Sequence, residues 1–399
     1  MRTRFLTLLL LFLTNIVQAQ VNDSTTILDN TFRSDIYASH FGKTQIGGYA
    51  QIDYNQPFGD TLSQNGTFDV HRLVIFIGHK FNDRLSFFSE IELEHVKEIF
   101  VEQAFLEMKL THWMNLRGGL LLIPMGIVNE YHEPPTFNGV ERPNLEKYIV
   151  PTTWREIGLG FSGNLPSAAF NYQLYIVNGP LSYENGTALF GGKSGMRSGR
   201  QKGAKSIFSG NPNLSMKVSY YGFQGLSLGL SGYFGKSQST LYNGLDKNNA
   251  DLITQADSSV VGINMLGFDA RYRIKGFQAR GVFNMTHFSN TLEYNSFTGS
   301  DLGSTMVGYY AEAGYDILST SRKIEDQLIV FARYEVYNTH QSTTSEIQVN
   351  NQYNRTDITA GLHYKPFNNT SFKADYQLFS NDLDTSGKHQ INLGVGVWF

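Results

Sequence analysis

The sequence predicts an all-β fold: a sixteen-stranded antiparallel transmembrane β-barrel with short periplasmic turns and long extracellular loops. The end of the chain is the first observation, because apolar residues occupy every second position from Ile391 to Phe399. Such alternation gives a strand with one apolar face, and it recurs along the chain. A closed barrel accommodates this last strand, which pairs with the first and turns its apolar face to lipid. The second observation is composition: 39 Gly, 22 Tyr and 29 Phe accompany only 10 Pro.

The first residues have the pattern of a secretory signal peptide. Two arginines precede an apolar run at 5–17, and a small-residue cleavage pattern ends at Ala19. This run is too short for a stable membrane anchor, so residues 1–19 are expected to be removed during export. Residues 20–43 are polar and lack alternation, and they are expected to form a short periplasmic segment before a barrel domain at 44–399.

Composition excludes several classes of function. The chain carries 32 basic and 35 acidic residues, and this near balance gives no electrostatic basis for binding nucleic acid. It contains no cysteine, so it forms neither disulfides nor thiolate metal sites, which suits a protein that crosses an oxidising periplasm. No segment resembles an energy-coupling element, and no cofactor is expected.

The lengths of the connections indicate the orientation of the barrel. Short turns such as 80–83 and 275–276 alternate with long connections such as 125–154 and 178–213, which is the arrangement of an outer-membrane barrel. Most of the alternating segments are close to the ~9–11 residues that a tilted strand needs to cross. The expected strands are 44–54, 68–79, 84–94, 99–110, 114–124, 155–162, 168–178, 213–222, 226–235, 262–274, 277–287, 305–317, 327–338, 356–365, 370–379 and 389–399.

Charged residues share one face of most expected strands. In the strand at 84–94, Glu90, Glu92 and Glu94 lie opposite a face of Leu, Phe and Ile. A charge that faces lipid at mid-membrane costs about 2–4 kcal/mol, so the charged faces are expected to point into the lumen.

The segment 99–110 does not follow this rule. Glu102 falls on one parity and Glu107 on the other, so a regular strand would turn one of the two carboxylates to lipid. The sequence leaves the facing of this strand undecided.

The connection at 125–154 is the main candidate for a functional site. It is polar, yet it carries several aromatic residues, and Pro134 and Pro135 stiffen its middle. Long loops without secondary structure of their own are usually functional. We expect this loop to fold into the lumen and narrow the pore, with an external lid as the alternative. The candidate constriction residues are Asn129, Glu130, His132, Glu133, Glu141 and Arg142.

Charged side chains on the inward faces are candidates for the lumen lining. The glutamates at 90–94 stand ~6–7 Å apart along one strand face, a separation that glycosidases also use. Such rows are common on a wet barrel wall, so no catalytic residues are expected. His132 lies near Glu130 and Glu133 without a diagnostic ligand spacing, so no metal is expected. The lumen-lining candidates are Glu90, Glu92, Glu94, Arg117, Arg271, Arg273, Arg280 and Arg333.

The long connection at 178–213 carries basic residues separated by Gly and Ser. Such a cluster can gather anions at the mouth of a pore by focusing the electrostatic field. Two alternatives stay open, namely contact with lipopolysaccharide phosphates and contact with another subunit. The candidate anion-gathering residues are Lys193, Arg197, Arg200, Lys202 and Lys205.

Five motifs carry a resemblance to a known family. They are Phe68-Asp-Val-His-Arg-Leu73, Val101-Glu-Gln-Ala-Phe-Leu-Glu107, Gly118-Gly-Leu-Leu-Leu-Ile-Pro-Met-Gly126, Asn129-Glu-Tyr-His-Glu-Pro-Pro135 and Trp154-Arg-Glu-Ile-Gly-Leu-Gly160. This segment resembles the phosphate-selective porin O and P family, in the form found in bacteria of the Bacteroidetes type. The resemblance implies a homotrimeric outer-membrane channel whose third long loop enters the pore. Phosphate-selective members line their pores with Arg and Lys, whereas the inner faces here mix both charges, so phosphate selectivity does not follow.

The sequence therefore predicts an outer-membrane porin for passive diffusion of small hydrophilic solutes through a water-filled barrel, with anions such as phosphate among the candidates. The expected partners are outer-membrane lipid, lipopolysaccharide and the solutes, in a homotrimer. The alternative is a barrel adhesin or barrel enzyme whose function lies in the external loops. An adhesin tolerates a blocked pore, so channel activity distinguishes the two classes.

Overall fold

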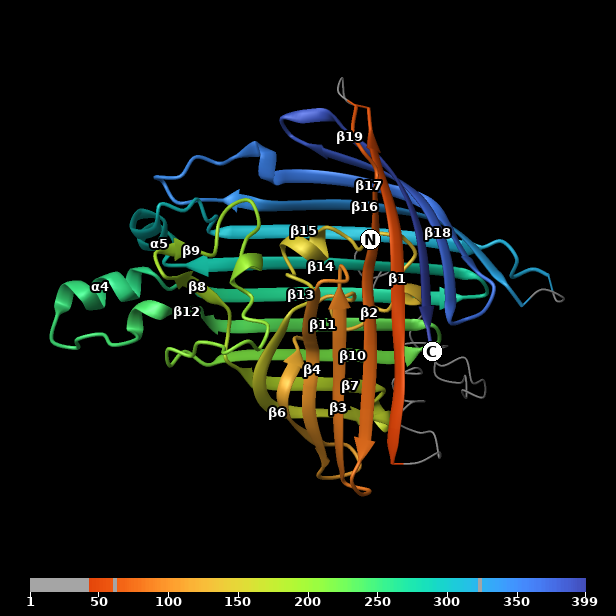
Figure 1. Cartoon of the computed structure of the whole chain (residues 1–399), viewed down its shortest axis with the longest axis horizontal. Helices are drawn as coiled ribbons and strands as arrows, with labels where there is room; N and C mark the ends of the chain where they lie inside the picture. Colours follow the sequence, from red (N-terminus) through yellow and green to blue (C-terminus); the bar gives the residue numbers. More distant parts are fainter. Residues whose placement is uncertain (1–42, 60–62, 322–324) are drawn as a thin grey trace, which may run out of the picture.

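The structure is a computed structural model that describes residues 43–59, 63–321 and 325–399. The expected signal peptide and almost all of the expected periplasmic segment lie outside the described residues. Sixteen strands close into one antiparallel barrel, in which β1 (Thr44–Phe58) pairs with β19 (Asp384–Trp398) (Figure 1). The predicted fold class is confirmed.

The barrel strands follow one another around the wall in chain order. Every predicted strand is present, and β1, β16 and β19 extend furthest beyond their predicted bounds. Their extra residues are mostly polar, because pairing between strands continues beyond the apolar belt, where no alternation marks it. The remaining barrel strands are β2 Thr67–Lys80, β3 Leu85–Glu94, β4 Glu98–Lys109, β5 Asn115–Leu122, β6 Arg155–Leu165, β7 Phe170–Val177, β10 Asn213–Phe223, β11 Leu226–Lys236, β13 Gly262–Ile274, β14 Phe277–Ser289, β15 Thr305–Asp316, β16 Gln327–Ser342, β17 Asn354–Lys365 and β18 Thr370–Asn381.

The last strand closes the barrel as its alternation predicts. Ile52 of β1 lies opposite Val395 of β19, and both side chains are exposed on the outer face. Ile391 is 45% exposed, whereas its neighbour Asn392 is 0% exposed and faces the interior. One parity therefore meets lipid and the other meets the inside of the barrel, as a membrane barrel requires.

A β-bulge decides the facing of β4. The pairing of β3 with β4 slips by one residue, so that Glu102 is the extra residue on β4. Val101 before the slip and Leu106 after it are both exposed on the outer face, although they differ in parity. Glu102 is fully buried and Glu107 is bound from the inner wall, so both carboxylates point inward. Glu102 and Glu107 can both face inward, although they differ in parity, because the bulge makes β4 irregular.

The external loops contain small elements that the sequence does not predict. They gather at one end of the barrel, on the left of Figure 1, around α4, α5 and a three-stranded sheet in the order β12, β8, β9. None of the helices in the described ranges is long and apolar enough to cross a membrane. These elements are β8 Leu181–Glu184, β9 Thr187–Ala188, η3 Arg197–Gly199, β12 Gln238–Ser239, η4 Thr240–Tyr242, α4 Ala250–Ser258, α5 Thr291–Thr298 and η5 Asn351–Tyr353.

The interior of the barrel is filled across its middle. Tyr175, Tyr233 and Tyr310 are buried on the inner faces of their strands, and so are the polar side chains of Arg333 and Gln377. The lumen is therefore narrowed at this level by buried side chains. The physical reason is that the connection after β5 occupies the lumen and covers the inner wall.

Candidate functional site

The connection between β5 and β6, residues 125–154, lies inside the barrel. It contains η1 (Pro134–Thr136) and α3 (Leu145–Tyr148), and of its residues Lys147 alone is classed as exposed. Below, "loop base" means residues 125–129 with 149–154, and "loop tip" means residues 134–141. The barrel wall therefore encloses the loop along most of its length.

Asn129 closes the loop base. Its side-chain amide donates to the backbone oxygens of Ile123, at 2.7 Å, and of Trp154, at 2.9 Å. Its side-chain oxygen accepts from the backbone N–H of Trp154 at 2.6 Å. Asn129 is fully buried, so one side chain satisfies polar groups at both ends of the loop.

The loop base is held by apolar packing. Met125, Ile149, Val150 and Trp154 are all fully buried and belong to one cluster with the inner faces of the strands. The ring of Trp154 lies 4.6 Å from the ring of Tyr233, between centroids. Burying a large apolar side chain contributes about 1.5–3 kcal/mol, so the base is a rigid anchor.

Glu146 of α3 ties the helix to the start of the loop. Its carboxylate accepts hydrogen bonds from the backbone N–H groups of Ile127, at 3.0 Å, and Val128, and from the Tyr310 hydroxyl at 2.8 Å. Burial raises the pKa of Glu146 to about 7, although these hydrogen bonds favour the charged form. The charge at this position therefore changes near neutral pH.

The loop tip is held by polar contacts with the barrel wall. Asn138 donates to Glu312 at 2.8 Å, and the backbone N–H of Val140 donates to Asp375 at 2.6 Å. Lys373 donates to the backbone oxygen of Gly139 at 2.8 Å. The tip thus offers hydrogen-bonding groups to charged side chains of β15 and β18.

A charge network on the wall supports these contacts. Arg333 lies between two carboxylates, with Glu335 at 2.9 Å and Glu312 at 3.3 Å. Glu335 also accepts the backbone N–H of Leu145 at 3.2 Å, and Asp357 accepts from Asn144 at 2.7 Å. The predicted lumen-lining residue Arg333 is therefore a buried structural partner of the loop.

Two predicted constriction residues make charge contacts with the wall. Glu130 lies 2.6 Å from Lys217, which is also 2.9 Å from Asp269. Burial opposes ionisation of Glu130, but the Lys217 ammonium and hydrogen bonds from Lys217 and Gln173 outweigh it and lower the pKa of Glu130. His132 lies 3.1 Å from Glu102 of β4. The two residues therefore contact different strands, β10 and β4.

The other charged constriction candidates, Glu141, Arg142 and Glu133, differ in exposure and in hydrogen-bond partner. Glu141 accepts from Asn55 of β1 at 2.7 Å and is partly accessible. Arg142 donates to the backbone oxygen of His132 at 3.3 Å, and burial lowers the pKa of Arg142 to about 10. Glu133 is buried, and its backbone oxygen accepts from Thr136 at 2.6 Å. The six constriction candidates therefore have different partners and do not form one ring of charges around the pore.

The three glutamates of the predicted row, Glu90, Glu92 and Glu94, differ in burial. Glu90 and Glu92 are buried beneath the loop, and Arg72 of β2 lies 3.2 Å from Glu92. Glu94 lies nearer the outer end of β3 and is partly accessible. Arg117 of β5 forms a close pair with Glu107 at 2.6 Å. Two of the three glutamates are thus covered rather than lining open water.

A cavity of about 910 Å³ lies on the short-turn side of the loop. It contains the other predicted lining residues, Arg271, Arg273 and Arg280, and also Lys275 and Lys365, which sequence reasoning missed. Both lysines close or adjoin short turns, where alternation ends and facing is hard to read. We name this cavity the vestibule.

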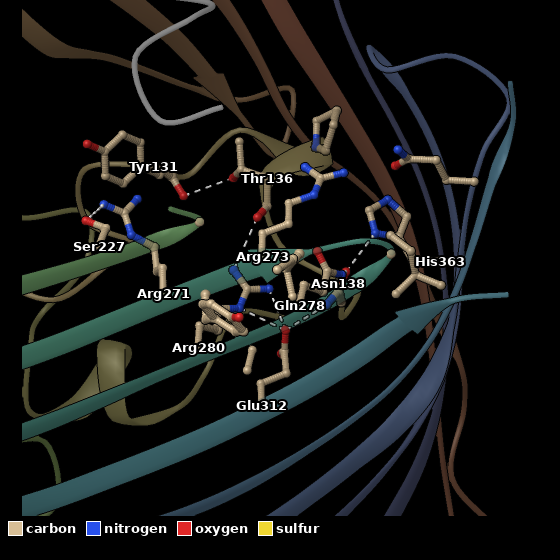
Figure 2. A pocket seen from close by; sticks show the side chains of 18 of the residues that line it. Tyr131, Thr136, Asn138, Ser227, Arg271, Arg273, Gln278, Arg280, Glu312 and His363 are labelled. Atoms are coloured by element: carbon tan, nitrogen blue, oxygen red, sulfur yellow. Dashed lines mark hydrogen bonds and ion pairs between the residues drawn. The ribbon is translucent and has the colours of Figure 1, made fainter. Parts of the chain in front are cut away.

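Figure 2 shows how the loop and the wall meet in the vestibule. Arg280 lies between the Thr136 backbone oxygen, at 3.2 Å, and Glu312, at 2.6 Å. The guanidinium of Arg271 stacks on the ring of Tyr131 at 4.5 Å from its centroid. Glu312 is the acidic residue among the lining residues. The vestibule therefore has a surplus of positive charge.

The predicted anion-gathering cluster separates into two groups. Arg197 and Arg200 donate to backbone oxygens of residues 147–153, and burial lowers the pKa of Arg200 to about 9. Lys202 lies over the ring of Phe100 at 4.2 Å. Lys193 and Lys205 are exposed. The arginines hold the loop base from outside, and the two exposed lysines alone remain as surface charges.

The geometry defines a class: a sixteen-stranded outer-membrane β-barrel with one long loop folded into its lumen. No family model matches the chain. It is 33% identical over 340 residues to an uncharacterized protein of Aquifex aeolicus (strain VF5), over 83% of this chain and 74% of the relative. The chain belongs to the family of that Aquifex protein.

Solved structures of similar fold are outer-membrane proteins. A loop L8 deletion mutant of OmpT from Vibrio cholerae has a TM-score of 0.55 and 10% identity, covering 90% of this chain and 100% of that chain. The outer membrane channel DcaP of Acinetobacter baumannii has a TM-score of 0.55 and 11% identity, over 89% and 97%. An anion-selective porin from Comamonas acidovorans has a TM-score of 0.54 and 13% identity, over 89% and 99%. These likenesses concern the fold.

Proposed function

We propose that this protein is an outer-membrane channel for small hydrophilic solutes, with a preference for anions. The observation that carries the proposal is the charge of the vestibule, where five basic side chains face a cavity with one acidic side chain. The five are Arg271, Arg273, Lys275, Arg280 and Lys365, and the acid is Glu312.

The acidic side chain of the vestibule already has basic partners. Glu312 is bound by Arg280 at 2.6 Å and by Arg333 at 3.3 Å, so its charge is already balanced. A cavity with low-dielectric walls focuses the remaining positive field and raises the local concentration of anions. Chloride, carboxylates and phosphates are therefore favoured over cations of the same size.

The path proposed for solutes runs past the loop tip. Water and polar solutes can replace the hydrogen bonds that hold Asn138 and Val140 to the wall, whereas the loop base is held mainly by a large apolar cluster. The constriction residues proposed on this path are Glu141 and Arg142, which are partly accessible at the end of the tip.

Membership of the phosphate-selective porin O and P family is part of the proposal. Its support is the set of five motifs between Phe68 and Gly160, together with a barrel of the implied strand count. Because the inner wall carries both positive and negative charges, we expect no selectivity for phosphate over other anions. Competition between phosphate and chloride in conductance measurements tests this finer point.

We also propose a homotrimer. The trimer form of Vibrio cholerae OmpT is among the structures of similar fold. In the described part of the chain, β4 pairs with β5 through residues 104–109 and not through 98–103, and Ile99 there is 72% exposed. A strand edge without a paired strand is costly against lipid, so a second copy is the proposed partner. Chemical crosslinking of the detergent-solubilised protein tests the stoichiometry.

The deciding experiment is reconstitution into a planar bilayer with a KCl gradient. We expect open channels, and we expect the sign of the reversal potential to show that chloride permeates better than potassium. Replacing Arg273 and Lys365 by Gln should move that potential towards zero, whereas Lys247→Gln in an external loop should leave it unchanged. The filled lumen is the observation that favours the second candidate, a barrel adhesin. Folded barrels that never conduct would support the adhesin and contradict the channel.

A further inference from the structure

Three metal-binding side chains meet where the lumen loop touches the barrel wall. Glu90 comes from β3, Glu102 from β4 and His132 from the loop, and one ligand atom of each lies within 4.8 Å of the other two. All three side chains are buried. Ligands bound to one Zn²⁺ at about 2 Å stand up to about 4 Å apart, so small rotations would close this set around an ion.

The β-bulge creates the wall half of this cluster. Without the extra residue in β4, the parity that turns Gln103 and Phe105 inward would turn Glu102 towards lipid. The bulge instead places the Glu102 carboxylate beside Glu90 of the neighbouring strand. The sequence grouped His132 with Glu130 and Glu133, but Glu130 lies against Lys217, so the fold selects different partners.

The orientation of His132 directs its Nε2 at the cluster. Its Nδ1 lies 3.4 Å from the backbone oxygen of Asn129, which can only accept, so Nδ1 carries a hydrogen. In the neutral ring, Nε2 then presents its lone pair to Glu102 Oε2 at 3.1 Å, whereas a protonated ring forms an ion pair with it. Two such electron pairs need a cation or a proton between them. A histidine whose other nitrogen donates to a backbone carbonyl is the usual arrangement of a metal ligand.

The nearby arginine does not satisfy the Glu102 carboxylate. Arg72 Nη1 is 3.2 Å from Glu92 Oε1 but 3.7 Å from Glu102 Oε1, so Arg72 pairs first with Glu92. Glu102 Oε1 is fully buried and accepts no hydrogen bond from the described residues. A buried carboxylate oxygen without a hydrogen-bond donor destabilises the folded protein. A bound cation would remove this penalty.

We propose that Glu90, Glu102 and His132 bind one divalent transition-metal ion of the Zn²⁺ class. One imidazole with two carboxylates suits Zn²⁺, Co²⁺ or Ni²⁺ better than Ca²⁺, which takes six or more oxygen ligands. Two ligands belong to the wall and one to the loop, so the site is complete only when the loop is docked. The ion would therefore pin the loop near its middle, whether or not the barrel conducts.

Metal content tests the proposal without any measurement of conductance. Full-length folded protein in detergent is treated with a chelator, dialysed, and loaded separately with ZnSO₄, CoCl₂ or CaCl₂. One Zn²⁺ or Co²⁺ per chain is expected, with a Co²⁺ absorption spectrum typical of mixed nitrogen and oxygen ligands. Folded protein that retains neither Zn²⁺ nor Co²⁺ overturns the proposal, because a proton then fills the gap. Retention of Ca²⁺ in preference to Zn²⁺ overturns it as well.

Variants assign the binding to these side chains. Glu102→Gln and His132→Gln are each expected to weaken Zn²⁺ binding by at least about tenfold. Glu107→Gln is the matched control, because Glu107 lies on the same strand and points inward but pairs with Arg117. Equal loss in the control contradicts the assignment. If a ligand variant does not fold, as judged by electrophoretic mobility of the unheated barrel, the wild-type Co²⁺ spectrum decides alone.

Discussion

The loop base and the loop tip differ in the kind of contact that holds them inside the barrel. The base rests on Met125, Ile149, Val150 and Trp154 in a dry cluster. The tip also buries Phe137 and Val140, but it adds hydrogen bonds and charge contacts with the wall, such as Val140 with Asp375. Water cannot replace the apolar contacts of the base, but it can replace the polar contacts of the tip. The comparison teaches that one segment combines a fixed anchor with a part that solutes can displace.

Magnitudes support this division. Each large apolar side chain of the base contributes about 1.5–3 kcal/mol. A hydrogen bond of the tip contributes a net of about 0.5–1.5 kcal/mol, because its partners bond to water when it breaks. The tip is therefore the part of the loop that yields first.

Deleting the loop tip should have the largest effect on conduction. Removal of residues 134–140 leaves the loop base in place and opens the lumen beside β18 and β19, so single-channel conductance should rise severalfold. A planar bilayer measures this change directly. Deletion of residues 245–248 in an external loop is the control and should leave conductance unchanged. Equal conductance of the tip deletion and the wild type would falsify the role of the tip as the constriction.

Trp154→Ala should have the largest effect on stability. Truncation of a fully buried Trp leaves a cavity and costs about 3–5 kcal/mol. Asn138→Ala in the tip should cost less, about 1–3 kcal/mol, by leaving Glu312 with fewer partners. Urea unfolding in detergent micelles, followed by circular dichroism, compares the two. A greater loss of unfolding free energy for Asn138→Ala than for Trp154→Ala would contradict the proposal that the base, and not the tip, anchors the loop.

Glu146 should make the stability of the folded loop depend on pH. Burial raises the pKa of Glu146 to about 7, so the folded protein keeps a proton that the unfolded chain loses at lower pH. Stability should therefore be greatest below about pH 4.5 and fall by up to about 3 kcal/mol as pH rises to 7. The difference between wild type and Glu146→Gln, measured by urea unfolding across this range, isolates the effect. A difference that does not vary with pH argues against it.

Charge reversal in the vestibule should change selectivity by a smaller factor. Arg273→Glu adds a negative charge to a cavity whose surplus is positive, so the permeability ratio of chloride to potassium should decrease. The reversal potential in a KCl gradient measures this ratio. Low ionic strength should enlarge the change, because salt screens the field over about 10 Å at 0.1 M. Lys247→Glu, outside the vestibule, is the matched control.

The smallest effects should come from the exposed lysines of the 178–213 connection. Lys205→Gln removes a solvated charge and should change stability by less than about 0.5 kcal/mol. Arg200→Gln is the contrasting change, because it leaves the backbone oxygens of Pro151 and Thr153 without their donor. Urea unfolding midpoints compare the two variants. Equal midpoints would contradict the structural role of Arg200.

Several features of the candidate site were readable from the sequence. The length and aromatic content of residues 125–154 predicted a packed loop, and the parity of Arg271, Arg273 and Arg280 predicted their inward facing. The partners of these residues were not readable. Asn138 meets Glu312 across 174 positions of sequence, and such contacts follow from barrel closure rather than from local pattern. Lys365 was missed because it ends its strand beside a turn, where alternation no longer indicates facing.

The sequence by itself determined the barrel, because an alternation of lipid-facing and interior residues leaves a closed sheet as the only way to satisfy the backbone in a membrane. It also determined which face of nearly every strand meets lipid. The tertiary structure alone decided that the middle of the lumen is filled, that a bulge turns Glu102 inward, and that His132 meets it. These outcomes depend on contacts between residues far apart in the chain, and their energies exist only once the barrel has closed around the loop.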